Sequence, residues 1–504
     1  MNLAKGNLMS ENIIPAEEII VPPVPVPVVD IPRIAIIGGG ISGLAAAHKI
    51  LELCEQKKTK VDLILLESSR QVGGHLGTLQ KQNCIIEMAA DAIFTEKPWG
   101  LDFCKKLGLQ NELIETNSEH RTSFISFQNK LIPVPQGFYL LAPSQLLPIL
   151  RSSLFTWKGK LRIFWELFIP KKNEQTENGE IADESLGSFV KRRFGQEVLD
   201  RIAQPMVAGI YSVHPNDLSL KATFPQFLEW EKKYGSIIKA LWKQPKLNSN
   251  AQGPRYHLFI SFRKGMQTLI DACVKKLPEG TIQTGITIQD IQNDKTGKRK
   301  FTIVSPHHEI GVDAICLAVP CPQASLLVKT IDSFISQQLE KIRYSCGITV
   351  NFLYPASAIE IPKGFGFVVP SIENKTISGC TFTNIKFPNR APRDKILIRA
   401  FVGGKNADNI IKYNDKKIET LVLNDLQKIL KIKRNPIFTF VHRYSQSLPI
   451  YKVGHSETVQ KIQSKVKNIS GLALAGNGYE GVGIPDCVQS GELAAEKIMR
   501  DLLN

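Results

Sequence analysis

The pattern of apolar and polar positions changes abruptly near residue 33. Residues 33–37 (RIAII) form a short apolar run, a glycine-rich turn follows at 38–43, and residues 44–54 have helical spacing. A second apolar run at 61–66 ends at Glu67. Uninterrupted apolar runs are typical of strands buried on both faces, as in parallel sheets. The pattern therefore predicts a strand–turn–helix–strand unit of a Rossmann-like α/β fold.

The rest of the chain alternates between helical and strand-like segments. We expect helices over 100–109, 144–169 and 186–205, a hairpin over 121–134 turning at Asn129-Lys130, and a final strand–turn–helix over 472–502. Further strands are expected at 281–291, 300–304, 312–319, 347–354, 365–369, 378–383 and 396–402. A proline-rich extension (1–31) should be extended, and residues 170–184 read as a polar loop.

Composition narrows the class of protein. The 504 residues carry a formal net charge of +16 and are 43% hydrophobic, which fits a globular protein of two or three domains. No window approaches the ~18 uninterrupted apolar residues of a spanning helix, and the N-terminus has no secretory signal pattern. The nine cysteines include no Cys-x-x-Cys pair, which predicts reduced thiols and no metal site. The basic excess suggests an anionic partner, but no nucleic-acid-binding module is present, so nucleic acid is not expected.

The first chemical motif is Gly38-x-Gly40-x-x-Gly43. Its glycines permit a tight turn, close approach of backbone to a pyrophosphate, and close helix–strand packing. The N-terminus of the following helix offers free N–H groups to phosphates, and Ile41 and Ser42, just before it, are candidate contacts. Glu67, at the end of the next strand, is placed to bind a ribose and to repel a 2′-phosphate. This combination predicts dinucleotide binding and argues against NADP.

A second glycine-rich loop stands at the C-terminus. It runs from Gly476 through Gly481, Val482 and Gly483 to Ile484, and a final helix is expected to start near Pro485. A strand would deliver this loop to a helix N-terminus, where N–H groups can face the O2/N1 edge of a flavin. A capped terminal helix would explain Pro485 but not so many glycines.

Several motifs resemble known flavoproteins. Glu67 and Ser68 followed by Gly73-Gly74 resemble the second FAD-contacting segment of the amine-oxidase-like superfamily, with His75 in place of its usual basic residue. Met88-Ala89-Ala90 replaces an expected Gly-Pro. The C-terminal loop closely resembles the FAD motif of the oxygen-dependent protoporphyrinogen/coproporphyrinogen oxidases. Further strips of that family are similar to residues 131–138, 205–211, 262–269 and 387–392, so the resemblance spans about 33–500.

The resemblance implies FAD as cofactor and a porphyrinogen as substrate, oxidised to the porphyrin in haem biosynthesis with molecular oxygen as acceptor and hydrogen peroxide as product. Protoporphyrinogen and coproporphyrinogen both remain open. FAD carries the chemistry, so no catalytic side chain is assigned. Candidate substrate contacts, each also readable as a surface charge, a bend or a core residue, are Lys97, Gly209, Ile210, Arg255 and Arg390. Same-fold alternatives are an amine oxidase, a carotenoid desaturase and a flavin-free scaffold.

The expected domains interleave along the chain. Residues 33–97, 255–320 and 440–504 should form the FAD domain, and 98–254 and 321–439 the substrate domain. Residues 157–172 mix Trp and Phe with Lys and Arg, which is typical of an interfacial helix on an anionic membrane; the alternative buries the aromatic face in the core. A cytoplasmic protein, peripheral on the membrane, is therefore one expectation. The iron-inserting chelatase and a second copy of the chain are further candidate partners.

Overall fold

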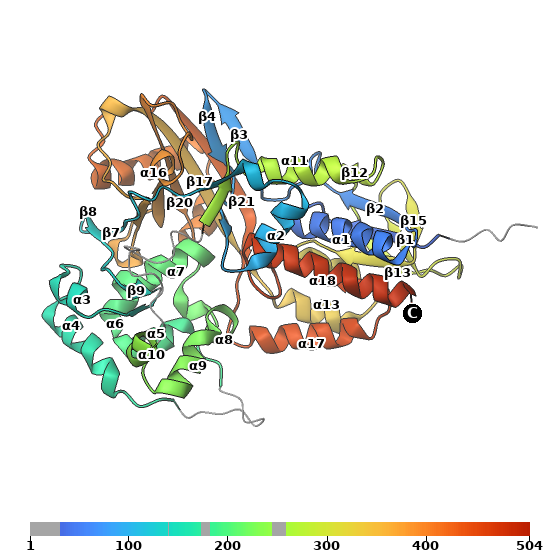
Figure 1. Ribbon diagram of the computed structural model, residues 1–504, viewed down its shortest axis with the longest axis horizontal. Coiled ribbons are helices and arrows are strands. Elements are labelled where there is room, and N and C mark those ends of the chain that lie inside the picture. Colours follow the sequence, from blue (N-terminus) through green and yellow to red (C-terminus); the bar gives the residue numbers. More distant parts are fainter. Residues whose placement is uncertain (1–30, 140, 173–181, 244–258, 504) are drawn as a thin grey trace, which may run out of the picture. The chain divides into compact units, whose positions relative to one another are not determined.

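The computed structural model describes residues 31–139, 141–172, 182–243 and 259–503. A parallel sheet lies at the centre of its first hydrophobic core (Figure 1). The expected extension, apart from Ile31, and Arg255 lie outside these ranges. In the described residues this sheet has five strands in the order β12 (Ile282–Thr284), β2 (Asp62–Glu67), β1 (Arg33–Ile37), β16 (Ala314–Leu317) and β22 (Leu472–Leu474).

Alternate residues of β1 face two different cores, as the period of a strand requires. Ile34 and Ile36 pack under α1 (Ile41–Lys57), α2 (Pro98–Lys106), α11 (Gln267–Lys276) and α18 (Ile484–Leu503). Ala35 and Ile37 pack against α12 (Cys321–Val328), α13 (Ser333–Glu340), α17 (His455–Lys467) and an antiparallel sheet of β13 (Asp290–Asn293), β14 (Phe301–Val304) and β15 (Glu309–Val312). Both faces are thus covered, which explains the uninterrupted apolar runs.

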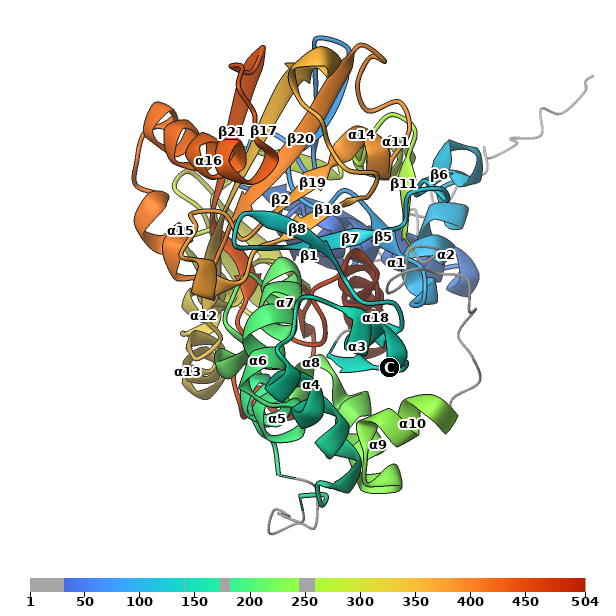
Figure 2. The same ribbon diagram turned by 90° about the vertical axis from the view of Figure 1, so that its left-hand side faces the viewer.

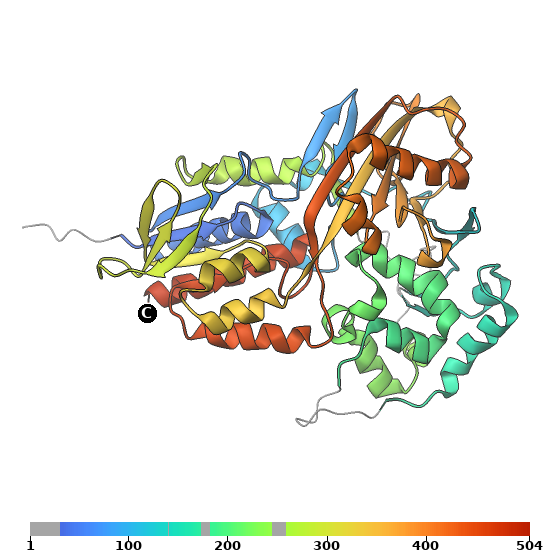
Figure 3. The ribbon, with the colours of Figure 1, turned by 180° about the vertical axis from the view of Figure 1, so that it is seen from behind.

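A larger mixed sheet stands beside this core. Its seven described strands run in the order β21 (Phe438–Pro449), β17 (Tyr344–Pro355), β20 (Lys395–Val402), β19 (Gly379–Phe382), β18 (Gly366–Val368), β7 (Ser123–Phe127) and β8 (Lys130–Pro133). Its outer face carries Val350, Phe352 and Ile398, which are buried under α16 (Asp415–Leu430). Figure 3 shows this helix lying over the sheet from behind. We call the opposite face the inner face; Thr349, Asn351 and Arg399 belong to it.

Short helices form a third core below β7 and β8 (Figure 2). They are α3 (Leu147–Arg151), α4 (Trp157–Phe164), η2 (Trp165–Phe168), α5 (Leu186–Phe194), α6 (Gln196–Val198), a π-helical turn η3 (Leu199–Ala203), α7 (Gln204–Tyr211), α8 (Leu220–Thr223), α9 (Pro225–Tyr234) and α10 (Ile237–Lys243). The expected helix 144–169 is interrupted because Thr156 caps α4, its Oγ1 accepting from Gly159 N at 3.1 Å. The expected helix 186–205 breaks at Gly195, which has φ +95°.

Smaller sheets link these cores. One is β5 (Ile93–Phe94), β11 (Phe259–Phe262) and β6 (Leu113–Glu115); two hairpins are β3 (Thr78–Lys81) with β4 (Cys84–Glu87) and β9 (Phe138–Tyr139) with β10 (Ala142–Pro143). The β3–β4 hairpin packs Cys84 and Ile86 on Leu353 and Leu397 of the inner face. Further helical segments are α14 (Thr383–Lys386), α15 (Lys405–Ile410) and the short 3₁₀ turns η1 (Gln110–Glu112), η4 (Pro215–Asp217), η6 (Ala356–Ala358) and η7 (Ser371–Glu373).

The structure confirms the α/β fold class and shifts several expected boundaries. Helices α2, α12 and α13 were expected in the substrate domain but bury their apolar residues against the parallel sheet. The boundary at residue 440 falls inside β21, which pairs with β17 over most of its length. The hairpin at 121–134 turns at Gln128 and Asn129, both with positive φ, one residue earlier than expected.

Candidate functional site

The turn after β1 contains glycines of two kinds. Gly38 and Gly43 are required by close packing, whereas Gly40 is not. A Cβ on Gly38, whose φ is +107°, would lie 2.4 Å from the carbonyl oxygen of Ala318, and one on Gly43 would lie 2.0 Å from that of Gly38. A Cβ on Gly40 would meet no protein atom within 4 Å. Helix α1 starts at Ile41 with no side-chain cap on its N–H groups. Gly40 therefore leaves open space beside an uncapped helix N-terminus, the arrangement that receives a phosphate.

Glu67 lies at the same place, at the end of β2. Its Oε2 accepts a hydrogen bond from Gly39 N at 2.7 Å, and its Oε1 accepts from Ser69 N at 2.8 Å and from Ser68 Oγ at 3.3 Å. The side chain is 8% exposed. The carboxylate is thus held rigidly against the glycine turn, where the sequence predicted a ribose contact.

The second glycine segment touches the first directly. Gly73 N donates to Gly39 O at 2.8 Å, and Gly40 and Gly73 form a parallel bridge. Gly73 and Gly74 have φ of +119° and +59°. These backbone conformations favour glycine, and they bring residues 38–40 and 73–74 together as the resemblance implied.

The C-terminal loop is held by side chains from outside it. Tyr451 Oη donates to Asn477 O at 2.5 Å and accepts from Gly481 N at 2.9 Å, so one hydroxyl bridges the two ends of the loop. The Tyr451 ring stacks on His455 at 4.0 Å between centroids. Gly476 N donates to Ser490 Oγ at 3.0 Å. These contacts leave space beside Gly476, because a Cβ placed there would have Val319 O, 4.0 Å away, as its nearest neighbour.

Helix α18 brings this loop to the first turn. A Cβ on Gly491 would lie 2.1 Å from Ser42 O, so α1 and α18 cross in contact there. Asp486, in the first turn of α18, accepts from Gly483 N at 3.1 Å and from Lys97 Nζ at 2.5 Å. Because Lys97 is paired with a buried carboxylate, its expected role as a substrate cation stays a prediction.

His75 joins these loops to the inner face of the large sheet. Its ring meets Tyr444 edge-on at 4.9 Å, and Tyr444 lies 4.4 Å from His442. His75 is exposed, and desolvation by the surrounding protein lowers its pKa, with the charge of His442 acting in the same direction. Burial also lowers the pKa of His442, so both imidazoles are neutral at pH 7.

Arg399 anchors the segment that replaced the expected Gly-Pro. Its guanidinium donates to Met88 O at 2.8 Å and to Ala89 O at 2.6 Å, and Thr349 Oγ1 donates to Met88 O at 3.4 Å. Residues 88–89 therefore lie against the inner face. Arg399 itself is 3% exposed.

The other expected substrate contacts divide. Gly209 and Ile210 are exposed at the end of α7, and a Cβ on Gly209 would lie 3.6 Å from Val368, an inner-face residue of β18. Arg390 is 0% exposed, with its guanidinium 2.7 Å from Ser261 Oγ and 3.5 Å from Glu87 Oε1. The interpretation of Arg390 as a solvated surface charge is thus wrong. Arg255 lies outside the described residues, and its role stays a prediction.

Residues missed from the sequence share one property: they act from a neighbouring element. Tyr451, Arg399 and Tyr444 belong to no motif. Only strand pairing and loop packing bring Tyr451 to the C-terminal loop, Tyr444 to His75 and Arg399 to residues 88–89. Nothing in the sequence marked Arg399 or Tyr444.

Two classes of site are not observed in the described ranges. No cluster of three or more His, Cys, Asp or Glu side chains there could hold a metal ion. No helix there has the length and apolar character needed to cross a bilayer. The open space at Gly40, the uncapped N-terminus of α1 and the fixed Glu67 together fit a dinucleotide. These features define a dinucleotide-binding protein of the Rossmann-like class.

Sequence comparison identifies the family. Residues 41–499 match the family described as flavin containing amine oxidoreductase, and the chain belongs to it. FAD is therefore its cofactor. A coproporphyrinogen III oxidase of Bacillus subtilis strain 168 is 30% identical over 94% of this chain and 99% of its own length. The mitochondrial protoporphyrinogen oxidase of Nicotiana tabacum is 28% identical, with 93% and 94% covered.

A solved structure agrees with this assignment. A crystal structure assigned as a protoporphyrinogen oxidase from Exiguobacterium sp. 255-15 superposes with a TM-score of 0.81 at 27% identity, covering 94% of this chain and 99% of that one. The expected family and fold are confirmed.

Proposed function

We propose that this protein oxidises a porphyrinogen to the porphyrin in haem biosynthesis, with FAD as cofactor and molecular oxygen as acceptor. The main support for this proposal is the sequence similarity to porphyrinogen oxidases, which covers nearly the whole of this chain and of each relative. The contacts that bring the three glycine segments together support the flavin site. Both protoporphyrinogen and coproporphyrinogen fit these observations.

The residues of this chain would divide the work as follows. When bound, FAD supplies hydride acceptance at N5 and reoxidation by oxygen to give hydrogen peroxide. Gly38, Gly40, Ile41, Ser42 and Gly43 would cradle the pyrophosphate, and Glu67 with Ser68 the ribose. Gly73, Gly74 and His75 would border the flavin, and the C-terminal set Gly476, Gly481, Val482, Gly483 and Ile484 would donate backbone N–H groups to its polar edge.

A paired aerobic fluorescence assay tests the reaction. Protoporphyrinogen IX and coproporphyrinogen III are offered separately to FAD-loaded protein, and porphyrin appearance is compared with spontaneous oxidation. Faster conversion of the first or the second names the substrate. Rates equal to the spontaneous rate with both would refute the proposal, whereas uptake of FAD with oxidation of an amine or carotenoid instead would favour the same-fold alternatives. A protein that never takes up FAD would favour the scaffold.

We further propose that α4 and η2 bind an anionic membrane surface. Trp157, Leu161, Trp165 and Phe168 are 72%, 70%, 63% and 74% exposed. Their spacing of four, four and three residues places them on one face of a continuous helical segment. The expected alternative, an aromatic face buried in the core, is therefore wrong for these four side chains.

The charge of this region fits an anionic bilayer. Within residues 144–172 and 237–243, Glu166 is the one carboxylate, whereas Arg151, Lys158, Lys171, Lys239 and Lys243 are exposed. Exposed aromatic residues with cations and no exposed carboxylate are the composition of interfacial helices.

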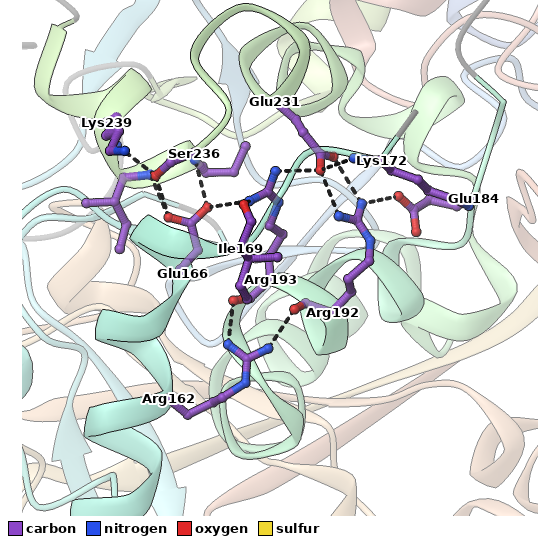
Figure 4. Close-up of polar contacts among 12 residues, drawn as sticks. Arg162, Glu166, Ile169, Lys172, Glu184, Arg192, Arg193, Glu231, Ser236 and Lys239 are labelled. Atoms are coloured by element: carbon purple, nitrogen blue, oxygen red, sulfur yellow. Dashed lines mark hydrogen bonds and ion pairs between the residues drawn. The ribbon is translucent and has the colours of Figure 1, made fainter. Parts of the chain in front are cut away.

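Glu166 points inward instead, as Figure 4 shows. Its carboxylate, 0% exposed, accepts from Ser236 Oγ at 2.5 Å and Ile237 N at 2.8 Å, and faces Arg193. Arg193 is also 0% exposed and pairs with Glu231. This network fixes η2 to α5, α9 and α10. Because Glu166 is turned inward, no exposed carboxylate of residues 144–172 lies beside the exposed stripe formed by Trp157, Leu161, Trp165 and Phe168.

Co-sedimentation with liposomes tests whether this stripe binds an anionic membrane surface. We expect binding to vesicles containing anionic lipid at low salt, and loss of that binding in a Trp157→Gln/Leu161→Gln/Trp165→Gln variant. Leu326→Gln is the matched control, because Leu326 is 69% exposed on α12, away from the stripe. Equal sedimentation of both variants, or no binding by the unmodified protein, would contradict the proposal. Product transfer to an iron-inserting chelatase and a homodimer stay predictions.

A further inference from the structure

Tyr344, the first residue of β17, contacts the C-terminal glycine loop through its hydroxyl. Its Oη lies 3.1 Å from Asn477 Oδ1 and 3.3 Å from Cys321 N, the first N–H group of α12. Because that N–H group has no acceptor within its own helix and can only donate, the Tyr344 oxygen accepts from it. The single Tyr344 proton is then donated to Asn477 Oδ1, since Cys321 Sγ is a weaker acceptor and lies 3.8 Å away.

This chain of hydrogen bonds has one direction at neutral pH. Burial raises the pKa of Tyr344 well above its ordinary value, and the nearby Cys321 acts in the same direction. Burial also raises the pKa of the Cys321 thiol, to about 11. Both groups therefore keep their protons at pH 7, and the Asn477 amide is fixed with its oxygen toward Tyr344.

The backbone of the loop packs directly on the same two side chains. A Cβ on Gly478 would lie 2.1 Å from Cys321 Sγ and 3.0 Å from Tyr344 Oη. Cys321 is 0% exposed, and a short, fully buried side chain has no space into which its sulfur could move. The glycine at 478 therefore allows the loop to lie against β17 and α12.

A second contact with Asn477 comes from the neighbouring strand. Tyr344 pairs with Pro449, the last residue of β21, and Tyr451 follows two residues later. Tyr451 donates to the main-chain carbonyl of Asn477 and accepts from Gly481 N, whereas Tyr344 holds the Asn477 side chain. The paired ends of two strands of the large sheet thus fix one loop residue at both its main chain and its side chain.

We infer that Tyr344 is a positioning residue for the flavin: through Asn477 it holds the C-terminal glycine loop where the backbone N–H groups of the loop stabilise the charge of reduced FAD. The inference rests on the flavin contact proposed above for this loop and extends it to residues outside every glycine motif. Dipoles stabilise a developing charge only while they are held in place. Loss of the hydroxyl should therefore weaken binding of reduced FAD more than binding of oxidised FAD.

The chain offers a closely matched set of variants. Tyr344→Phe removes the hydroxyl and keeps the ring, so the variant should fold. Asn477→Ala removes the amide through which the hydroxyl acts, and combining the two changes completes a double-mutant cycle. Tyr354→Phe is the control, because Tyr354 lies near the other end of β17, is 0% exposed, and has a buried hydroxyl with no hydrogen-bond partner in the part of the chain that the structure describes.

The measurement is the flavin midpoint potential of each holoenzyme, from anaerobic reductive titration against a reference dye. A lost hydrogen bond of about 1 kcal/mol should reduce the preference for reduced over oxidised FAD about fivefold to tenfold in Tyr344→Phe. For a two-electron couple this makes the potential about 20–30 mV more negative. Asn477→Ala should shift the potential in the same direction, and the double variant should match Asn477→Ala alone. Tyr354→Phe should keep the potential of the unmodified protein.

Each alternative outcome counts against the inference. An unchanged potential in Tyr344→Phe would overturn it even if the Tm fell, because the hydroxyl would then serve the fold alone. Shifts that add in the double variant would overturn the action through Asn477, and an equal shift in Tyr354→Phe would show a general effect of losing a tyrosine hydroxyl. The potentials are measured without substrate, so failure of the unmodified protein to oxidise either porphyrinogen would refute the proposed function separately.

Discussion

Two glycines of one motif should fail in opposite ways when each is replaced by alanine. Gly38 has φ +107°, and its Cβ would lie 2.4 Å from Ala318 O, a backbone atom that cannot move aside. Gly40 has φ −69° and ψ 177°, which any residue adopts, and its Cβ would meet no protein atom. Gly38→Ala should therefore damage the fold, whereas Gly40→Ala should damage the ligand site alone.

The magnitudes follow from these contacts. Forcing a Cβ into a left-handed conformation costs about 1–2 kcal/mol, and the overpacking adds about 1–3 kcal/mol. Gly38→Ala should therefore lower the free energy of unfolding by ~2–5 kcal/mol. Gly40→Ala should stabilise the FAD-free protein by ~0.4–1 kcal/mol, because it restricts the unfolded chain only. If the new methyl group disrupts one hydrogen bond to a phosphate, FAD affinity should fall about 10- to 100-fold.

Urea unfolding of the FAD-free proteins gives the first quantity, and titration with FAD followed by flavin fluorescence gives the second. Gly311→Ala is a control, since Gly311 lies in β15 with an ordinary φ and only the flexible Arg299 side chain within 4 Å of its Cβ. The reasoning is refuted if Gly40→Ala binds FAD as tightly as the unmodified protein. It is equally refuted if Gly40→Ala lowers the free energy of unfolding as much as Gly38→Ala does.

Other predictions address the scaffold. Arg193→Ala should cost about 3–5 kcal/mol in urea unfolding, because two buried carboxylates lose their shared cation; Arg192→Ala, at a site 27% exposed, should cost less. Tyr451→Phe should lower the free energy of unfolding by about 2 kcal/mol, because the loop loses two hydrogen bonds of roughly 1 kcal/mol each while the stack on His455 remains, and it should weaken FAD binding about 5- to 10-fold. Burial lowers the pKa of His455 below its unfolded value near 6.5, so the unfolded chain takes up a proton that the folded chain does not. Stability should therefore fall as pH drops from about 7 through 6.5 toward the folded pKa, and His455→Gln should flatten this dependence in urea midpoints measured across that range.

The sequence was most informative where the structure depends on neighbouring residues. The turn at residues 38–43 needs glycine for reasons contained in the turn and its two flanking elements, so its motif could be interpreted directly. The C-terminal loop likewise follows its strand and precedes its helix in sequence. Both glycine segments could be recognised without knowing the rest of the fold.

Long-range packing could not be predicted in the same way. Helices α12 and α13 have apolar faces that would suit either core, and only the structure shows that they cover the parallel sheet. The same holds for α4, whose aromatic residues fit a core and a membrane surface equally well in sequence. Exposure of Trp157 and Leu161 decides between the two.

Which side chains lie on the inner face of the large sheet depends on the register of its strands, and the sequence does not specify that register. His442 lies opposite Thr349, and Tyr444 lies opposite Gly347, so both point to the inner face. A slip of one residue would turn both side chains toward α16. The pairing then shifts between Ser345 and Gly347, which places a bulge in β21 immediately after Tyr444.

That bulge lies between Tyr444, on the inner face, and Tyr451, which holds the C-terminal glycine loop. Before it, β21 holds Tyr444 in register on the inner face; after it, the strand resumes pairing at Leu448 and ends at Pro449. Two residues further on, Tyr451 reaches the C-terminal glycine loop. Bulges commonly re-aim side chains next to active sites, and here Tyr444 lies before the bulge while Tyr451, the anchor of the proposed flavin loop, follows the end of the same strand. A change in the length of residues 445–447 would therefore displace one relative to the other, while leaving every glycine motif intact.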